Sequence, residues 1–398
     1  MNSYRHSIGL RRCLMPGLAL CAAGMLLLAA CGGGAANSAA LSAASSARAA
    51  NSAAAPANAA GSRSGQLQGL IDSAAREGKL ELVMSEDTIG GSETAKLWAD
   101  GFNKLYGLKL QVQFTPGPAM PEMAGKIVQE YQANRTASTD VFLGAETHII
   151  SLMKAQALMP ADWPSWAFNI QNPRLVVPGN IAVEVSSNTP GITYNANKVA
   201  GAAVPKTMQD LLKPEYKGRI ASTPYAAIFD DLSTPELWGE QRTLDYLKKF
   251  AEQITGLIRS GEVQRVATGE FDLFALNTDG AAALKGQAQG VPLAHVVPND
   301  AAFIQYRYMG VPKNAAHPNA AQLFANYILS REAQDILYQR AFTDHYLLPG
   351  SKSAPAVQKL QASGVAFHDL DVQFIQRNDP QKLDAFLKQA VDILQNKR

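Results

Sequence analysis

The sequence predicts an α/β fold with two lobes, and three observations support this prediction. Segments with strand-like and helix-like periods alternate over residues 67–155, and a second alternating series follows residue 205. Between the two series, residues 181–195 alternate apolar and smaller side chains around the turn Thr189-Pro-Gly191, which indicates an extended segment that crosses between lobes. Residues 303–309 have the length and aromatic content of a return crossing. We therefore expect a ligand to bind beside two crossing strands.

The amino-terminal residues have the pattern of a secretory signal. Arginines precede an apolar run over residues 18–30, which ends in Leu28-Ala-Ala-Cys31. This tetrad resembles the bacterial lipobox, which implies cleavage before Cys31 and lipidation of that cysteine. Residues 1–30 are therefore predicted to be a lipoprotein signal peptide. The alternative is a retained membrane anchor, but the apolar run is shorter than the roughly 20 residues that a span requires.

Residues 31–66 are predicted to comprise the lipidated cysteine and a flexible linker. They consist mainly of Ala, Ser, Gly and Asn, with Arg48 and Arg63 as the only charges, so they cannot bury a hydrophobic core. The alternative is a helix driven by alanine, which the scattered glycines and serines oppose. A flexible linker of this length would hold the folded part clear of a membrane while keeping it tethered.

Cysteine usage and charge exclude several classes of function. Cys13, Cys21 and Cys31 are the three cysteines, and all lie in the leader or at its end, so the remainder has no thiol for catalysis, metal binding or a disulfide. The chain has a formal charge of +2, and removal of a leader with three arginines and no acid leaves about −1. This near-neutral balance gives no sign of a nucleic-acid partner.

The first alternating series predicts strands and helices whose connecting loops share one rim. The predicted strands are 79–84, 108–114 and 139–144, and the predicted helices are 67–75, 120–132, 147–155 and one that buries Leu97, Trp98 and Phe102. In open α/β sheets, ligands collect beyond the carboxyl ends of the strands. This rule places loops 85–92, 115–120 and 144–146 at one rim. Their glycines leave backbone amides open to an anion, whereas Glu86, Asp87 and Glu146 add negative charge.

The second series and the remaining chain complete the predicted domain organisation. Further strands are expected at 220–225, 271–276 and 293–297, and helices at Thr234 onward, 243–253, 261–268, His317 onward, Ser330 onward and after the cap Asp379. Residues 67–183 and 298–350 are assigned to the first lobe, and residues 184–297 to the second. The helices of residues 351–398 are assigned to neither lobe.

A search for catalytic motifs finds none. The sequence has no Gly-x-Ser-x-Gly, no His-Glu-x-x-His and no phosphate-binding Gly-x-x-x-x-Gly-Lys. The histidines after the leader are scattered without ligand spacing, and the carboxylate pair Asp230-Asp231 is interpreted as part of a loop or cap. An exported hydrolase is therefore not favoured. We predict no enzyme activity, no catalytic residue, no metal and no cofactor.

Several stretches resemble one family of transport proteins. They are Gly191-Ile-Thr-Tyr-Asn195, Lys198-Val199, 205–225, Gly269-Glu270-Phe-Asp272 and 308–334. Together they resemble the extracellular, or periplasmic, solute-binding proteins of ABC importers, in the subgroup that includes ferric-ion binders. The resemblance implies a type II-like periplasmic-binding-protein fold with two hinge-crossing strands. It also implies a protein that binds a small-molecule solute and docks to an ABC permease in the inner membrane. Together with the lipobox-like tetrad, this predicts a lipoprotein of the periplasm or cell envelope, anchored to a membrane through Cys31. We expect a monomer.

Candidate ligand-binding residues follow from position at strand ends or on the crossing, with side chains that donate and accept hydrogen bonds. They are Ser85, Thr115, Ser186, Ser187, Asn188, Tyr194, Thr223 and Asp279. A role in a turn or cap is the alternative for each. The ligand is expected to be a small polar organic solute. It would be either a phosphorylated or carboxylated compound held by amides near Thr115, or a cationic amine held by Asp279 and Glu146.

Ferric iron or a ferric complex is the alternative ligand, and the residues oppose it. The resemblance places an adjacent tyrosine pair of the ferric binders after the strand that follows Gly269-Glu270, but the matching positions here are Asp279 and Gly280. Tyr306 and Tyr308 alternate on one predicted strand, where the family places no metal ligands. A ligand-sensing lipoprotein of the same fold is a further alternative, because the chain alone does not separate sensing from transport.

Overall fold

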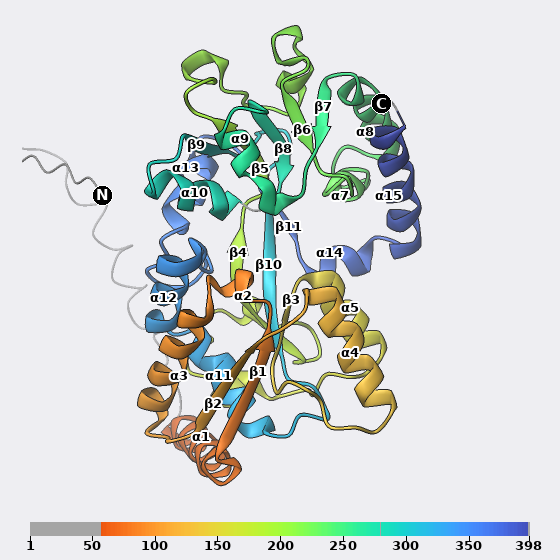
Figure 1. Cartoon of the computed structure of the whole chain (residues 1–398). Helices are drawn as coiled ribbons and strands as arrows, with labels where there is room; N and C mark the ends of the chain where they lie inside the picture. Colours follow the sequence, from red (N-terminus) through yellow and green to blue (C-terminus); the bar gives the residue numbers. More distant parts are fainter. Residues whose placement is uncertain (1–56, 279, 397–398) are drawn as a thin grey trace, which may run out of the picture. The chain divides into compact units, whose positions relative to one another are not determined.

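The computed structural model of the protein describes residues 57–278 and 280–396, with side chains from residue 65 onward. These residues belong to one compact unit. Two groups of strands are joined by two long strands, β4 (Ala182–Asn188) and β10 (Phe303–Gly310), which pair antiparallel (Figure 1). We call the group that contains the amino-terminal strands the first lobe, and the group around the five-stranded sheet the second lobe. The two predicted crossings therefore lie side by side between the lobes.

The first lobe is built on short strands covered by helices. Its strands are β1 (Lys79–Met84), β2 (Gln111–Pro116) and β3 (Phe142–Gly144). Its helices are α1 (Ala57–Glu77), α2 (Glu86–Ile89), α3 (Ser92–Tyr106), α4 (Met120–Gln132), α5 (Glu146–Lys154), α6 (Trp163–Trp166), α11 (Pro318–Ile328) and α12 (Arg331–Ala341), with the 3-10 turn η1 (Pro173–Leu175). Strands β1 and β2 pair parallel, and β3 pairs antiparallel with β10.

Alternation of apolar residues explains these elements and their core. Leu80, Leu82 and Met84 are buried on one face of β1, as the period of a strand requires. On α3, Trp98 and Phe102 are buried and meet Phe324 of α11 edge to face, with ring centroids 6.2 and 5.5 Å apart. Helix α11 therefore belongs to the core of the first lobe, although more than 200 residues separate it from α3.

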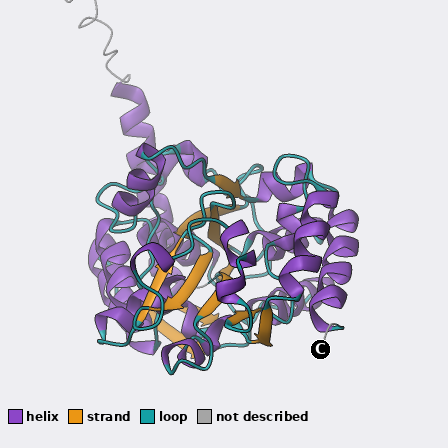
Figure 2. Ribbon diagram, turned by 90° about the horizontal axis from the view of Figure 1, so that it is seen from above, coloured by secondary structure: helices purple, strands orange, loops and turns teal. Residues whose placement is uncertain are grey.

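The second lobe is a five-stranded sheet with helices on its surface. Its strands are β5 (Gly191–Asn195), β6 (Ile220–Ser222), β7 (Ile254–Leu257), β8 (Leu273–Asn277) and β9 (Leu293–Val296), in the order β7-β6-β8-β5-β9. The other elements are α7 (Phe229–Leu232), α8 (Glu240–Ala251), α9 (Gln264–Ala267), α10 (Gly280–Ala288), η2 (Gly201–Ala203), η3 (Gln209–Leu212), η4 (Pro214–Tyr216) and η5 (Ser260–Glu262). Seen from above, helices lie on both sides of the strands (Figure 2).

The carboxyl-terminal segment contacts both lobes. Its elements are α13 (Ala354–Ala362), β11 (His368–Leu370), α14 (Val372–Arg377) and α15 (Pro380–Gln395). Strand β11 pairs parallel with β10, α14 packs on α5 of the first lobe, and α15 packs on α7 and α8 of the second lobe. The predicted cap of the last helix is present, because the Asp379 side chain accepts a hydrogen bond from the Gln381 amide, 2.9 Å away.

Two predicted boundaries differ from the structure. The predicted flexible linker extends to residue 66, but α1 begins at Ala57 and includes Gly61 and Gly65, because the high helix propensity of the alanines offsets the cost of these glycines. The helix predicted from Thr234 is instead a turn, because Gly239, with φ of +77°, reverses the chain and donates its amide to the Thr234 carbonyl. The lobe assignments themselves stay a prediction.

The leader with Cys31 and most of the linker lie outside the described residues, as does Asp279. Within the described part of the chain, no helix combines the length and apolar character that crossing a membrane requires.

Candidate functional site

A cavity of about 270 Å³ lies where the two lobes and the crossing strands meet. Its lining comprises Asp87, Thr88, Met120, Ala341 and Thr343 from the first lobe, Ser186, Asn188 and Arg307 from the crossing strands, and Ser260, Thr278 and Ala281 from the second lobe. Rotation of one lobe toward the other would change the volume of this cavity and its access to water. The cavity therefore has the position and the polar lining expected of a ligand site.

The first-lobe wall is formed by two of the predicted rim loops. Asp87 and Thr88 lie on α2, directly after β1, and Met120 begins α4 after β2. Gly90 ends α2 with φ of +80°, and a Cβ atom there would lie 2.6 Å from the backbone of Arg340. The glycine is therefore required by close packing against the end of α12, and this contact positions α2 at the cavity.

The second-lobe wall contains a cluster of hydroxyl groups. The Ser260 hydroxyl lies 2.9 Å from the Tyr225 hydroxyl and 3.1 Å from that of Thr278. The Tyr225 ring is 43% exposed, so the cluster is open to solvent. The adjoining backbone is strained, because Ile228 and Leu276 adopt positive φ angles of 71° and 48°. Strain of this kind persists only where the surrounding structure holds it, and it concentrates at functional sites.

The crossing strands place one cation in the cavity. Arg307 on β10 pairs with Ser186 on β4, and a bulge follows between Arg307 and Tyr308. The Tyr306 and Tyr308 side chains beside it are buried, whereas Arg307 is half-buried and lines the cavity. One of its nitrogens donates to the Tyr306 carbonyl at 3.2 Å, and it forms no ion pair within the described residues. This guanidinium keeps most of its donors for another partner.

The predicted site residues fall into two groups. Ser186 and Asn188 line the cavity, and the Asn188 amide also donates to the Thr278 carbonyl across the lobes. Ser187 points elsewhere and bonds to the Asp344 carbonyl and the Tyr346 amide, 3.1 and 3.0 Å away.

Four more of the predicted residues, all within the described part of the chain, are not part of the lining of this cavity. Ser85 precedes α2, Thr115 is exposed on β2, Tyr194 is half-buried in β5, and the Thr223 hydroxyl accepts from the Ala227 amide at 2.9 Å. Asp279 lies outside the described residues. The role of all eight residues in ligand binding stays a prediction.

Sequence reasoning missed Arg307, Ser260 and Thr278. Arg307 had a detectable signal, because it is the only charged residue in the apolar, aromatic run over 303–310. A charge in the middle of a buried strand requires a partner or a function. Ser260 and Thr278 had no such signal, since isolated hydroxyl residues in loops are usually caps or turns.

A polar network of buried and half-buried side chains lies at the crossing strands. The Tyr306 hydroxyl donates to Asp369 and accepts from Arg174 at 2.6 Å, and Arg174 pairs with Asp369 at 3.1 Å. Glu184 of β4 lies 3.2 Å from the His345 imidazole, and both side chains are buried. Burial raises the pKa of Glu184 to about 8, against the opposing effect of Arg174, and burial lowers the pKa of His345 to about 3. Both groups are therefore neutral at pH 7.

Replacement of Glu184 by glutamine is expected to flatten the pH dependence of thermal stability. Because the folded-state pKa is about 8 and the ordinary value is 4.5, the folded protein keeps a proton that the unfolded chain releases. This contribution to stability is complete below pH 4.5 and is lost as the pH rises through 8. Glutamine stays neutral, so the Tm of the variant relative to wild type should increase from about pH 5 to about pH 8. The exposed control is Glu122→Gln, which should follow the wild-type curve. If the Tm of Glu184→Gln also changes with pH in parallel with wild type, the raised pKa of Glu184 is contradicted.

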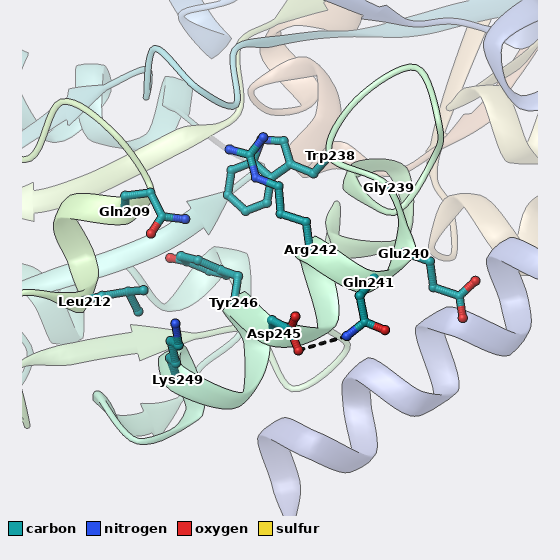
Figure 3. A pocket seen from close by; sticks show the side chains of 10 residues that line it. All are labelled: Gln209, Leu212, Trp238, Gly239, Glu240, Gln241, Arg242, Asp245, Tyr246 and Lys249. Atoms are coloured by element: carbon teal, nitrogen blue, oxygen red, sulfur yellow. Dashed lines mark hydrogen bonds between the residues drawn. The ribbon is translucent and has the colours of Figure 1, made fainter.

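A second cavity, of about 620 Å³, lies on the second lobe alone (Figure 3). It is lined by α8 residues together with Gln209, Leu212 and Trp238, and the Arg242 guanidinium stacks on the Trp238 ring at 4.6 Å. The polar atoms of its aromatic residues have internal partners, because Trp238 donates to the Asp300 carbonyl and Tyr246 to the Met208 carbonyl. This cavity is wide open and has no wall from the first lobe, so it does not match a closing ligand site.

Two α/β lobes, two crossing strands and a polar cavity between the lobes define a two-lobed periplasmic binding protein. Solved structures share this fold. The substrate binding protein of the ABC transporter from Agrobacterium tumefaciens superposes with a TM-score of 0.64 at 19% identity, over 81% of this chain and 96% of that one. AfuA from Actinobacillus pleuropneumoniae, with fructose-6-phosphate bound, superposes with a TM-score of 0.60 at 20% identity, over 79% of this chain and 98% of that one. Iron-bound HitA from Pseudomonas aeruginosa superposes with a TM-score of 0.59 at 18% identity, over 80% of this chain and 98% of that one.

Sequence comparison gives the family. Residues 98–367 match the family described as bacterial extracellular solute-binding protein, and the chain belongs to this family. The Fe(3+)-binding periplasmic protein of Serratia marcescens is 27% identical over 276 residues, which cover 67% of this chain and 79% of that protein. The major ferric iron-binding protein of Neisseria meningitidis serogroup A is 24% identical over 258 residues, 62% and 75% of the two chains. The predicted resemblance and the periplasmic part of the predicted location agree with these findings, and the family is one of solute-binding proteins rather than enzymes.

Proposed function

We propose that the protein captures a small polar organic solute with an anionic group in the cavity between its lobes and delivers it to an ABC permease. The observation that carries this proposal is Arg307, a half-buried cation without an ion pair among the described residues, which faces a cavity lined by both lobes. Ala281, the second residue of α10, lines the same cavity, so the positive end of this helix adds to the attraction for an anion. Hydroxyls of Ser260 and Thr278 would orient the solute.

Ferric iron is the competing ligand, because several curated relatives are named as iron-binding proteins. Gly280 occupies one position of the expected tyrosine pair, and a Cβ atom there would lie 2.8 Å from the His295 ring. The Tyr306 hydroxyl already bonds to Arg174 and Asp369. An iron site would therefore require these residues to rearrange, and an organic anion would not.

Addition of the correct solute is expected to stabilise and compact the protein. A panel of sugar phosphates, phosphonates, carboxylates, polyamines and thiamine is screened by thermal shift, where a ligand at 100 times its Kd adds about 2.7 kcal/mol of stability. Small-angle scattering then measures the radius of gyration with the best compound. An unchanged radius at saturation would contradict lobe closure. The protein is also titrated with ferric iron. If a visible phenolate-to-iron charge-transfer band forms in wild type and is absent from Tyr306→Phe, the ligand is iron.

The membrane attachment is a separate part of the proposal and rests on the lipobox-like tetrad before Cys31. Replacement of Cys31 by serine is expected to release the protein from the membrane fraction, with an unchanged Tm, because the proposed linker separates the anchor from the folded part. Fractionation followed by immunoblotting measures the distribution. Tight membrane association of the Cys31→Ser protein would contradict lipid anchoring at this residue.

A further inference from the structure

A third cavity, of about 350 Å³, lies between the lobes on the other face of the crossing strands. Ser186 and Arg307 are paired across β4 and β10 and face the cavity described above, which we call the solute cavity. Ser187, the next residue of β4, and Ile304, three positions before Arg307, line the third cavity instead. Because successive side chains of a strand point to opposite faces, the crossing strands separate the two cavities. We call the third cavity the hinge cavity.

Three residues line both cavities and form a common wall at the end of β4. They are Asn188, Ala281 and Thr343. The Asn188 side chain donates a hydrogen bond to the Thr278 carbonyl, so this wall is fixed by a contact between a crossing strand and the second lobe. The hinge cavity and the solute cavity are therefore neighbours with a shared wall, and each can hold a molecule of its own.

The walls of the hinge cavity are mostly apolar and come from three helices on one side of the crossing strands (Figure 1). Tyr338 and Phe342 come from α12 and its carboxyl end, Leu284 from α10, and Val357 and Leu360 from α13. Both lobes and the carboxyl-terminal segment thus contribute apolar side chains. Water in such a cavity finds few hydrogen-bond partners, so an apolar group displaces it readily.

Several polar side chains of the lining are already bonded to the protein itself. The Ser187 hydroxyl donates to the Asp344 carbonyl at 3.1 Å, and the Thr343 hydroxyl donates to the Ser187 carbonyl at 3.0 Å. The two ring nitrogens of His295 lie 3.2 and 3.0 Å from protein oxygens, and burial lowers its pKa to about 4, so the ring is neutral. Lys352 is the one charged side chain among the described lining residues. It is exposed and forms no ion pair within the described residues.

We propose that the hinge cavity is a second ligand site, which binds a small amphipathic acid with its apolar body between the helices and its carboxylate at Lys352. The volume corresponds to about twelve non-hydrogen atoms, if each takes the roughly 30 Å³ of a water molecule in the liquid. A single turn of an α-helix, about 10 Å wide and about 5.4 Å long, already exceeds this volume, so a helix of a partner protein does not fit. The site does not depend on the proposed function.

The test measures binding of octanoate, 1-octanol and butyrate by isothermal titration calorimetry on the mature Cys31→Ser protein, which carries no lipid at this residue. Octanoate is expected to bind about tenfold more tightly than butyrate or better, because only the longer chain covers the apolar walls. Lys352→Gln is expected to weaken octanoate about two- to fivefold and to leave octanol unchanged, since only octanoate carries a charge. Lys359→Gln, exposed on α13 and outside the lining, is the matched control and should bind octanoate as wild type does.

A variant that fills the hinge cavity gives a second test. Ala356 lines the cavity from an exposed position on α13, so Ala356→Trp adds an indole ring there without a change in a buried side chain. Octanoate and octanol should both bind about tenfold more weakly or worse to this variant. Gln358→Trp, exposed on the same helix and outside the lining, should bind both as wild type does. The Lys352→Gln comparison remains available if Ala356→Trp does not fold.

Arg307→Gln separates the hinge cavity from the solute cavity, because it should keep octanoate while it weakens binding of the solute. If Arg307→Gln loses octanoate and Ala356→Trp keeps it, the acid binds in the solute cavity and the hinge site is overturned. Equal affinity of Ala356→Trp and Gln358→Trp for octanoate would also overturn it, as would the absence of octanoate and octanol binding at millimolar concentrations. None of these outcomes decides the proposed function, which depends on the solute panel.

Discussion

Replacement of Arg307 by glutamine is expected to weaken binding of the solute by on the order of 30- to 1,000-fold, or about 2–4 kcal/mol. Glutamine keeps much of the length of the side chain but removes the charge and the paired donors that recognise a carboxylate or phosphate. Because Arg307 lies in the cavity and has no ion pair among the described residues, its loss should not break an internal contact of the same strength. Calorimetric titration of the best compound from the panel measures the change.

The control for this variant is Arg135→Gln. Arg135 is exposed after α4, and its described hydrogen bonds use the backbone: the carbonyl accepts from the Asn314 side chain at 2.7 Å, and the amide donates to the Glu130 carbonyl at 2.9 Å. This change should leave the affinity within about twofold. If Arg307→Gln folds with a wild-type Tm and binds the solute as tightly as Arg135→Gln, the anion does not bind at Arg307.

Replacement of Asp140 by alanine is expected to destabilise the protein by about 2–4 kcal/mol. The Asp140 side chain is 1% exposed and accepts hydrogen bonds from the Glu81 amide at 2.7 Å and the His317 amide at 2.9 Å, and it contacts the His317 ring at 2.8 Å. It therefore joins β1 to the start of α11. Alanine leaves these donors without an acceptor, and the Tm should fall by about 3–6 °C.

The matched control is Asp335→Ala on α12. Asp335 forms an exposed pair with Arg331 one helical turn away, at 2.7 Å. Exposed pairs of this kind contribute about 0.3–0.5 kcal/mol, so this Tm should move little. Similar Tm values for the two aspartate variants would mean that Asp140 does not join the two elements as its contacts indicate.

Local patterns in the sequence were sufficient for the elements whose period and end signals agree. Residues 120–132 form α4 and residues 79–84 form β1, as predicted, because apolar spacing and flanking turns give the same answer there. The crossing at residues 303–309 is likewise confirmed as β10. These elements depend on residues that are close together in the sequence, so the sequence of one chain is sufficient to predict them.

The composition of the cavity could not be predicted in the same way. Ser186 and Asn188 follow from their place on a crossing strand, but Ser260 and Thr278 enter the lining because β7 and β8 end at the same edge of the second sheet. The sequence offered an anion or a cation as ligand because both kinds of charge are present, and the place of Arg307 in the cavity is what favours an anion.

The contact between α1 and α11 has a consequence for how the chain acquires its structure. The Glu77 side chain at the end of α1 accepts hydrogen bonds from the Asn319 and Ala320 amides at the start of α11, 3.1 and 2.8 Å away. All of the second lobe is synthesised between these two helices. The first lobe therefore cannot complete its core until the ribosome has made α11, which lies in the last quarter of the chain, and such distant contacts form slowly. A nascent chain with this order of assembly stays incompletely folded for most of its synthesis, which is the state that a narrow export channel requires.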